Sequence, residues 1–315
     1  MADWLSLVLV TLGLALFEVI ISIDNAIINA EVLRTMSPKG RRWFLIWGIL
    51  IAVFLVRGLL PWIIVWVSAP ELGFLGSFTA SFSSDPHVAE IIEKSAPILM
   101  MGGGMFLVLL FFHWLFLEKK EYGLVGEQTI EKHGVWFFAV ASIILVGIVW
   151  TSIKVNPLLA LGAVIGSSAF FITHGFKENA EKVESQMMKK DSGLSDISKI
   201  FYLEIIDMTF SIDGVLGAFA FTFILPIILI GSGIGAIVVR QLTVANIENV
   251  KKYKYLKNGA MYSIFALGVV MTLHGFSVHV PEWVSPVLTF GIIGYFFWKS
   301  LRAIKAGYVP KTHTH

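Results

Sequence analysis

Long apolar stretches alternate with short polar segments along the whole chain. Nine of them reach or approach the roughly 20 residues that an α-helix needs to cross the hydrocarbon core of a bilayer. We expect these spans at Trp4–Val32, Trp43–Ser68, Pro97–Leu117, Val135–Ile153, Pro157–Gly175, Ile200–Phe223, Pro226–Asn246, Gly259–Phe276 and Val284–Leu301. The pattern predicts an all-α polytopic membrane protein with a single transmembrane domain over residues 1–315.

Basic residues predict how the spans are oriented. Lys and Arg gather in the segments after the first, third, fifth and seventh stretches, and the segments after the even-numbered stretches contain few of them. Since short basic loops stay on the cytoplasmic side, we expect the N-terminus outside and the C-terminus inside. Residues 177–199, which are rich in Lys and Glu, are expected to form a solvated cytoplasmic loop.

Composition narrows the possible functions. Hydrophobic residues make up 56% of the chain and charged residues 15%, against about 25% charged residues in ordinary soluble domains. The net charge of +2 is too balanced for a nucleic-acid binder. The absence of cysteine excludes disulfides, thiolate metal sites and cysteine nucleophiles. The oligomeric state stays open, with a homo-oligomer among the alternatives.

An acidic motif occurs twice in the chain. Glu18 is followed by a Ser-Ile-Asp sequence ending at Asp24, and Asp207 by the same sequence ending at Asp213. The interval from Glu18 to Asp207 equals that from Asp24 to Asp213, 189 residues. Because five spans separate the two copies, they enter the bilayer from opposite sides, which predicts two inverted-topology repeats. We place the first repeat at 1–153, a linking helix at 157–176, and the second, inverted repeat at 200–305.

Acidic residues inside the predicted spans are candidates for a cation site. A membrane-embedded carboxylate costs at least about 2.5–3.5 kcal/mol on insertion scales, so such residues are usually functional. Two arginines inside the spans, Arg57 and Arg240, could balance only part of the charge, and a divalent cation or protonation must balance the rest. The acids are Glu18, Asp24, Glu204, Asp207 and Asp213.

Helix geometry limits how these acids can act together. Glu18 and Asp24 cannot both ligate one ion from a straight helix, because six residues advance the chain by about 9 Å. Across antiparallel helices we expect Glu18 at the depth of Asp213, and Asp24 at the depth of Asp207. Carboxylate oxygens beside neutral ones, including that of Asn25, suit a hard or borderline cation.

Other polar and small residues suggest supporting roles. Asn25 and Gly214 directly follow the two motif aspartates and are expected positions for helix breaks. The glycines at 102–104 and at 231, 233 and 235 are expected to permit close helix contact rather than to bind a nucleotide. Three histidines near span ends, His113, His174 and His274, are candidate proton carriers if transport is coupled to protons.

The motif-bearing segments resemble the TerC family of integral membrane proteins over nearly the whole chain. The resemblance rests on Phe17-Glu-Val-Ile-Ile-Ser-Ile-Asp-Asn25, on Arg57, on the run Phe201–Phe221 that contains Ser-Ile-Asp-Gly-Val215, and on Thr173-His-Gly-Phe-Lys177. It implies a multi-pass protein of the inner membrane linked to tellurium resistance and, in several relatives, to manganese efflux. It also implies that Glu18, Asp24, Asn25, Asp207 and Asp213 match the membrane-embedded acidic motifs of the family.

Our leading hypothesis is a transporter of divalent cations, most simply a manganese exporter that works by alternating access between the two repeats. The cation would be a substrate rather than a permanently bound cofactor, and Arg57 and Arg240 would balance the empty site. One alternative is a membrane scaffold in a stress-resistance complex, with structural acids. A remote alternative is an intramembrane aspartyl protease, although neither Asp24 nor Asp213 lies in a Gly-x-Gly-Asp motif. We therefore do not expect an enzyme.

Overall fold

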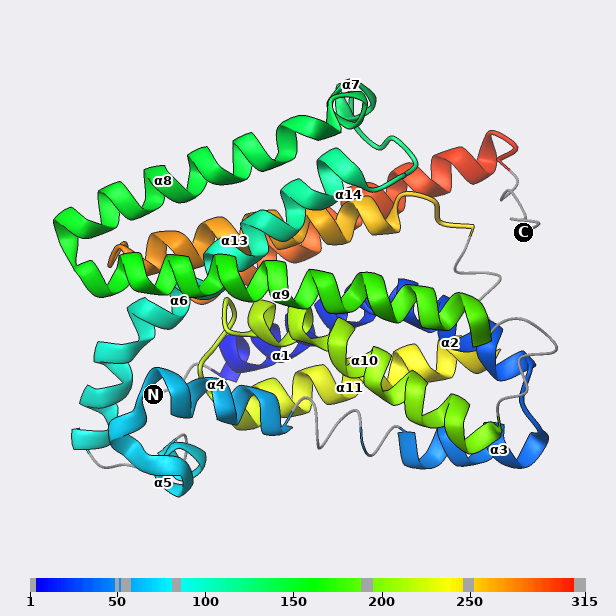
Figure 1. Cartoon of the computed structure of the whole chain (residues 1–315), viewed down its shortest axis with the longest axis horizontal. Coiled ribbons are helices and arrows are strands. Elements are labelled where there is room, and N and C mark those ends of the chain that lie inside the picture. The colour runs from blue at the N-terminus through cyan, green and yellow to red at the C-terminus, as the bar shows by residue number, and fades with distance from the viewer. Residues whose placement is uncertain are drawn as a thin grey trace.

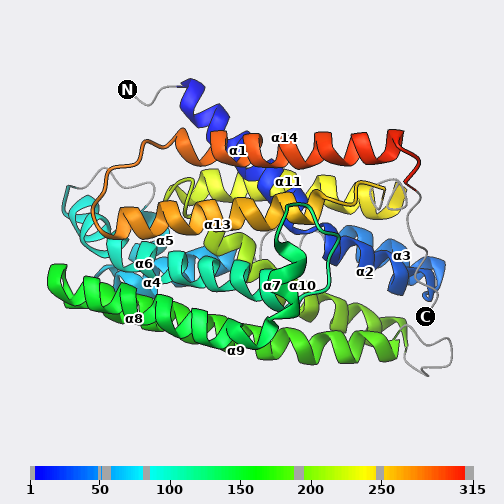
Figure 2. The same cartoon turned by 90° about the horizontal axis from the view of Figure 1, so that it is seen from above.

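The computed structural model describes residues 4–48, 51, 58–80, 86–187, 195–245 and 252–308, and every regular element within these ranges is helical. The long helices lie side by side along the longest axis of the molecule (Figures 1 and 2). The α-helices are α1 (Trp4–Ile21), α2 (Ile23–Arg34), α3 (Pro38–Trp43), α4 (Leu60–Ser68), α5 (Gly73–Thr79), α6 (Pro86–Leu117), α7 (Glu127–Lys132), α8 (Phe137–Val155), α9 (Pro157–Met187), α10 (Asp196–Ala218), α11 (Leu225–Ala245), α13 (Leu256–Gly275) and α14 (Val284–Lys305). Short π or 3-10 segments are η1 (Phe44–Gly48), η3 (Pro70–Leu72) and η5 (Gly134–Trp136).

Seven helices within the described ranges are long and apolar enough to cross a membrane. The segments are Trp4–Ile21, Lys94–Leu117, Gly134–Val155, Pro157–Phe176, Leu225–Leu242, Leu256–Gly275 and Val284–Lys305. Large apolar side chains are exposed along α8, among them Phe138, Ile143 and Trp150. Such a surface suits lipid as the surrounding solvent. Together these helices indicate a multi-pass α-helical membrane protein.

Two of the nine expected stretches are not among the seven. α10 occupies most of the sixth stretch, but its acidic residues make it too polar to count as an apolar span. Part of the second stretch lies outside the described ranges, and its described parts include η1 and α4. α4 and the segment Pro70–Thr79 are bent by 102° and together are apolar enough for one broken span.

The break in the first span lies at Ser22, between α1 and α2, and not at Asn25 as the sequence suggested. The Ser22 hydroxyl donates a hydrogen bond to the Glu18 carboxylate (Oε1, 2.7 Å), one turn earlier in α1. The second expected break was also wrong, since α10 continues through Gly214 to Ala218.

The predicted cytoplasmic loop 177–199 is helical at both ends, which corrects that prediction. α9 continues to Met187 and α10 begins at Asp196. Residues 177–187 contain three Glu and two Lys but neither Gly nor Pro, so their intrinsic preference is helical. Hydrophilic composition alone had suggested a loop, but it is equally compatible with a polar helix extension.

Glycines allow the central helices to approach closely, as the sequence predicted. α6 packs most extensively against α13 and α9. A Cβ atom at Gly166 of α9 would overlap the carbonyl oxygen of Gly102 on α6. On the other side of the bundle, a Cβ atom at Gly235 of α11 would lie 2.5 Å from Cβ of Glu18. The same small residues that close the helix contacts therefore position one of the candidate acids.

Candidate functional site

Glu18 is buried on α1, with 3% of its surface exposed. Its carboxylate accepts the hydroxyl of Ser22, and its Oε2 atom lies 3.1 Å from the position that a Cβ atom would take at Gly214. Gly214 directly follows Asp213 on α10, so Glu18 lies close to the residue that we expected at its depth. Because Gly214 has no side chain, the Glu18 carboxylate fits beside it, and α10 continues through this glycine without a break.

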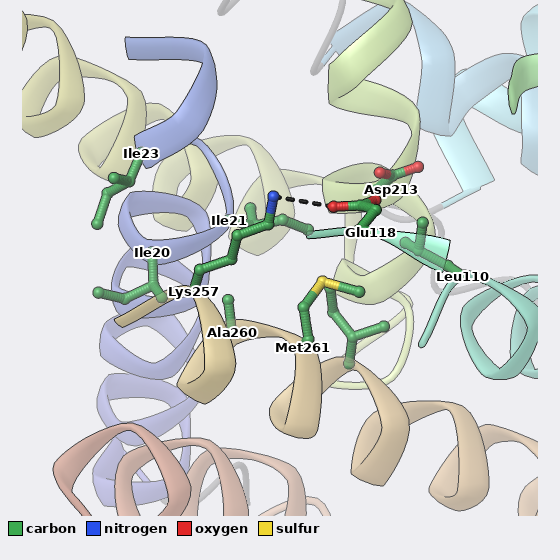
Figure 3. A pocket seen from close by; sticks show the side chains of 10 residues that line it. Ile20, Ile21, Ile23, Leu110, Glu118, Asp213, Lys257, Ala260 and Met261 are labelled. Carbon is green, nitrogen blue, oxygen red and sulfur yellow. Dashed lines mark ion pairs between the residues drawn. The ribbon is translucent and has the colours of Figure 1, made fainter. Parts of the chain in front are cut away.

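Asp213 lines a cavity of about 60 Å³ between α1, α2, α6, α10 and α13. The cavity also holds Glu118, at the end of α6, and Lys257, on α13, and their side chains form an ion pair of 2.9 Å (Figure 3). Apolar side chains form the rest of its wall: Ile20, Ile21, Ile23, Leu110, Ala260, Met261 and Ile264. The cavity thus brings two carboxylates and one ammonium group together from three different helices.

Arg240 and Glu204 form a second charged group that is separate from this cavity. Arg240 Nη2 lies 3.4 Å from Glu204 Oε1 and donates a hydrogen bond to the carbonyl oxygen of Phe44 (2.9 Å). The guanidinium group also stacks over the Phe44 ring at 3.8 Å, a favourable cation–π contact. Gly48 borders both charged groups so closely that any side chain there would overlap them. The predicted pairing of Arg240 with an acid is therefore present, with Glu204 as a partner.

The remaining predicted acids are placed less completely. Asp207 is buried on α10, and its backbone carbonyl accepts the Ser211 hydroxyl (2.7 Å). The side chains of Asp24 and Asn25, and the whole of Arg57, lie outside the described residues. Among the described residues, no three His, Asp or Glu side chains are grouped closely enough to hold a metal ion. The predicted acids whose side chains are described therefore lie in neighbouring sites and do not form one common site.

Two of the three histidines lie together. The rings of His113 on α6 and His174 on α9 have centroids 3.8 Å apart, and His174 stacks on Phe170. His274 is elsewhere, at the other end of α13 from Lys257, where its Nε2 atom lies 3.0 Å from the carbonyl oxygen of Val280. This contact suits a structural role in the turn after α13.

Several charged residues outside the predicted set also join the two halves of the chain. The carboxylate of Asp196 on α10 accepts the backbone amide and hydroxyl of Ser37, ahead of α3. Lys199 is buried and donates to the Thr35 hydroxyl (2.9 Å). Sequence reasoning assigned Lys199 and Lys257 to loops, and it did not single out Glu118. Their position beside predicted span ends was the available signal, but their partners are distant in sequence.

The fold and the buried acids define the class of protein: a multi-pass α-helical membrane protein with carboxylates between its helices. The chain belongs to the family described as "Protein of unknown function (DUF475)", which it matches over residues 23–306. No curated protein and no solved structure matches the chain. The matched range includes Asp24, Asp207 and Asp213, whereas Glu18 lies ahead of it.

Proposed function

We propose that this protein transports a divalent cation across the inner membrane, most simply as a manganese exporter that works by alternating access. The observation that carries the proposal is the position of carboxylates from both halves of the chain between packed helices. Glu18 of α1 lies against Gly214 of α10, and Asp213 of α10 faces a cavity that α1 also lines. Membrane-embedded carboxylates are costly and usually serve ion pathways.

Helix contacts support the inverted repeat on which this mechanism depends. α1 packs against α11, while α10 packs against η1 and α4 in the second stretch. The third helices of the two halves, α6 and α13, pack against each other and run in opposite directions (Figure 1). Secondary transporters with inverted repeats bind their substrates near the interface between the repeats, which is where the cavity beside Asp213 lies.

The distribution of basic residues supports the proposed orientation of nine spans, with the N-terminus outside. α1 begins at one end of the bundle, whereas α14 finishes at the other, together with α3 and the end of α9 (Figures 1 and 2). Arg41, Arg42, Arg302 and Lys305 belong to the elements at this second end. Basic residues favour the cytoplasmic side, and an odd number of crossings places the two termini on opposite sides.

The resemblance to TerC proteins and the available ligands support manganese as the substrate. Carboxylate and neutral oxygen ligands suit manganese, magnesium and calcium, and the chain has no thiolates that would favour zinc or copper. Glu204 and Arg240 would balance charge when the cation is absent.

The proposal is tested with purified protein in liposomes. Influx and efflux of manganese, magnesium, calcium, iron and zinc are each followed with a trapped metal-sensitive dye. We expect saturable manganese flux that exceeds the flux of protein-free liposomes. Protein that is folded and inserted but carries none of these cations would contradict the proposal and favour the membrane scaffold.

A further inference from the structure

Glu118 connects the cavity beside Asp213 to the buried histidine pair. Its Oε2 atom lies 2.9 Å from Lys257 Nζ, and its Oε1 atom lies 3.7 Å from Nδ1 of His113. The Glu118 side chain is 27% exposed and that of His113 only 10%. Glu118 is therefore the more exposed member of the pair. The gap of 3.7 Å is too long for a hydrogen bond, so a small side-chain movement or one bridging water is needed.

The segment that carries Glu118 is held in place by a buried network. Glu127, at the start of α7, accepts the backbone amide of Gly123 (2.6 Å), the Asn258 amide (3.1 Å) and the Tyr262 hydroxyl (2.9 Å). The last two residues are on α13, the helix that also carries Lys257. The distance between Glu118 and its two partners is thus set by packing rather than by a free loop.

His113 lies between a carboxylate and a second imidazole ring. Within the described ranges, the charged or titratable groups that face it are Glu118 and, on α9, His174; Lys257 of α13 and Asp213 of α10 lie beyond Glu118. The remaining neighbours include the rings of Phe137 and Phe170. The two imidazole rings and the carboxylate of Glu118 therefore form one cluster of proton-accepting groups.

We infer that the Glu118–His113–His174 cluster is a proton-binding site that couples protons to cation transport in the opposite direction. This inference rests on the proposed function. A proton taken up from solvent at His113 Nδ1 draws Glu118 away from Lys257, and the ammonium group of Lys257 then remains beside Asp213 and repels a cation. Cation binding in the cavity reverses these steps and returns the proton to the solvent. Proton and cation therefore exclude each other, and by linkage each weakens the binding of the other.

The test measures the affinity of the detergent-purified protein for manganese between about pH 6 and pH 8, where histidine titrates. If one proton is displaced per cation, the affinity of the wild-type protein falls by up to roughly tenfold for each unit by which the pH is lowered in this range. His113→Gln is expected to flatten this dependence while manganese binding persists. Glu118→Gln, which preserves the size of the side chain, is expected to flatten the pH dependence as well. Because it removes the carboxylate that pairs with Lys257, it should also weaken manganese binding at every pH.

His274→Gln is the matched control, because His274 is also a half-buried histidine but lies in the turn after α13. We expect it to retain the wild-type pH dependence. His174→Gln replaces His113→Gln if the latter does not fold. The same pH dependence in the wild type and in the cluster variants would overturn the coupling site while leaving the transporter intact. No manganese binding by the wild type at any pH would instead overturn the proposed function, and the coupling site with it.

Discussion

Glu18, Glu204 and Asp213 occupy three different electrostatic environments, although the sequence places all of them in predicted spans. Glu18 is buried beside a serine hydroxyl, Glu204 contacts an arginine, and Asp213 shares a cavity with Glu118 and a lysine. An unpaired charge is more costly in a buried position than in an exposed one. Glu204 therefore depends on Arg240 for stability, whereas Asp213 faces a cavity.

Removing the arginine of the Glu204–Arg240 pair should destabilise the protein. Arg240→Met leaves a largely buried carboxylate without this partner, which costs about 3–5 kcal/mol in folded proteins. We expect a clearly lower unfolding temperature in detergent, and partial recovery when Glu204→Gln is added. Lys94→Met is the control, because the Lys94–Glu90 pair is exposed and exposed pairs contribute about 0–1 kcal/mol. Equal unfolding temperatures for Arg240→Met and the wild type would contradict this role.

At the scale of the secondary-structure elements, contacts at glycine residues determine how closely the helices approach one another. Gly102 and Gly166 bring α6 and α9 into backbone contact, and Gly235 brings α11 against Glu18 of α1. Without a hydrophobic driving force in lipid, helices associate through such close packing. The position of Glu18 therefore depends on Gly235 of α11, a residue that has no side chain.

A methyl group at Gly166 should separate α6 from α9. We expect Gly166→Ala to lower the unfolding temperature, by an amount corresponding to roughly 1–3 kcal/mol for overpacking. Gly147→Ala on α8 is the matched control, since a Cβ atom there meets nothing within 4 Å, and alanine is the better helix former. Thermal unfolding in detergent compares the two variants. A neutral Gly166→Ala would show that this helix contact does not stabilise the fold.

Sequence periodicity predicts the helices better than it predicts their contacts. Long apolar runs identify α6, α8, α11, α13 and α14, and the glycine clusters indicate close contacts. The break at Ser22 and the continuation of α10 past Gly214, where the Glu18 carboxylate lies beside the glycine, are not marked in the linear pattern. The same holds for Glu118, whose partner Lys257 comes from a helix much later in the chain.

The contacts between the proposed repeats also could not be predicted from the sequence pattern. The sequence suggested four helices in each repeat, with α9 as the link. In the structure α14 contacts α13 and α1, and α9 contacts the corresponding helices α6 and α10; α8 contacts α6 less extensively. The contacts of α9 therefore resemble those of α14 more than the contacts of α8 do. α8 packs mainly on α9.

At the scale of the whole molecule, the proposed orientation is open to a direct test. The chain has no cysteine, so a single introduced cysteine is the one labelled site in the protein once it is purified from the cells. We expect a membrane-impermeant maleimide on intact cells to label Glu90→Cys, in a segment proposed to be external, and not Val125→Cys, in a segment proposed to be cytoplasmic; both wild-type side chains are exposed. Opening the cells should make Val125→Cys reactive. The reverse pattern would invert the topology.

The central claim is that carboxylates from both halves of the chain handle the transported cation. The most direct measurement is manganese flux in proteoliposomes containing the wild type, Asp24→Asn, Asp213→Asn and, as a control, Glu282→Gln, which removes an exposed acid. We predict that flux is lost in both aspartate variants, although each still folds and inserts, and that it persists in the control. Wild-type flux in both aspartate variants would contradict the claim.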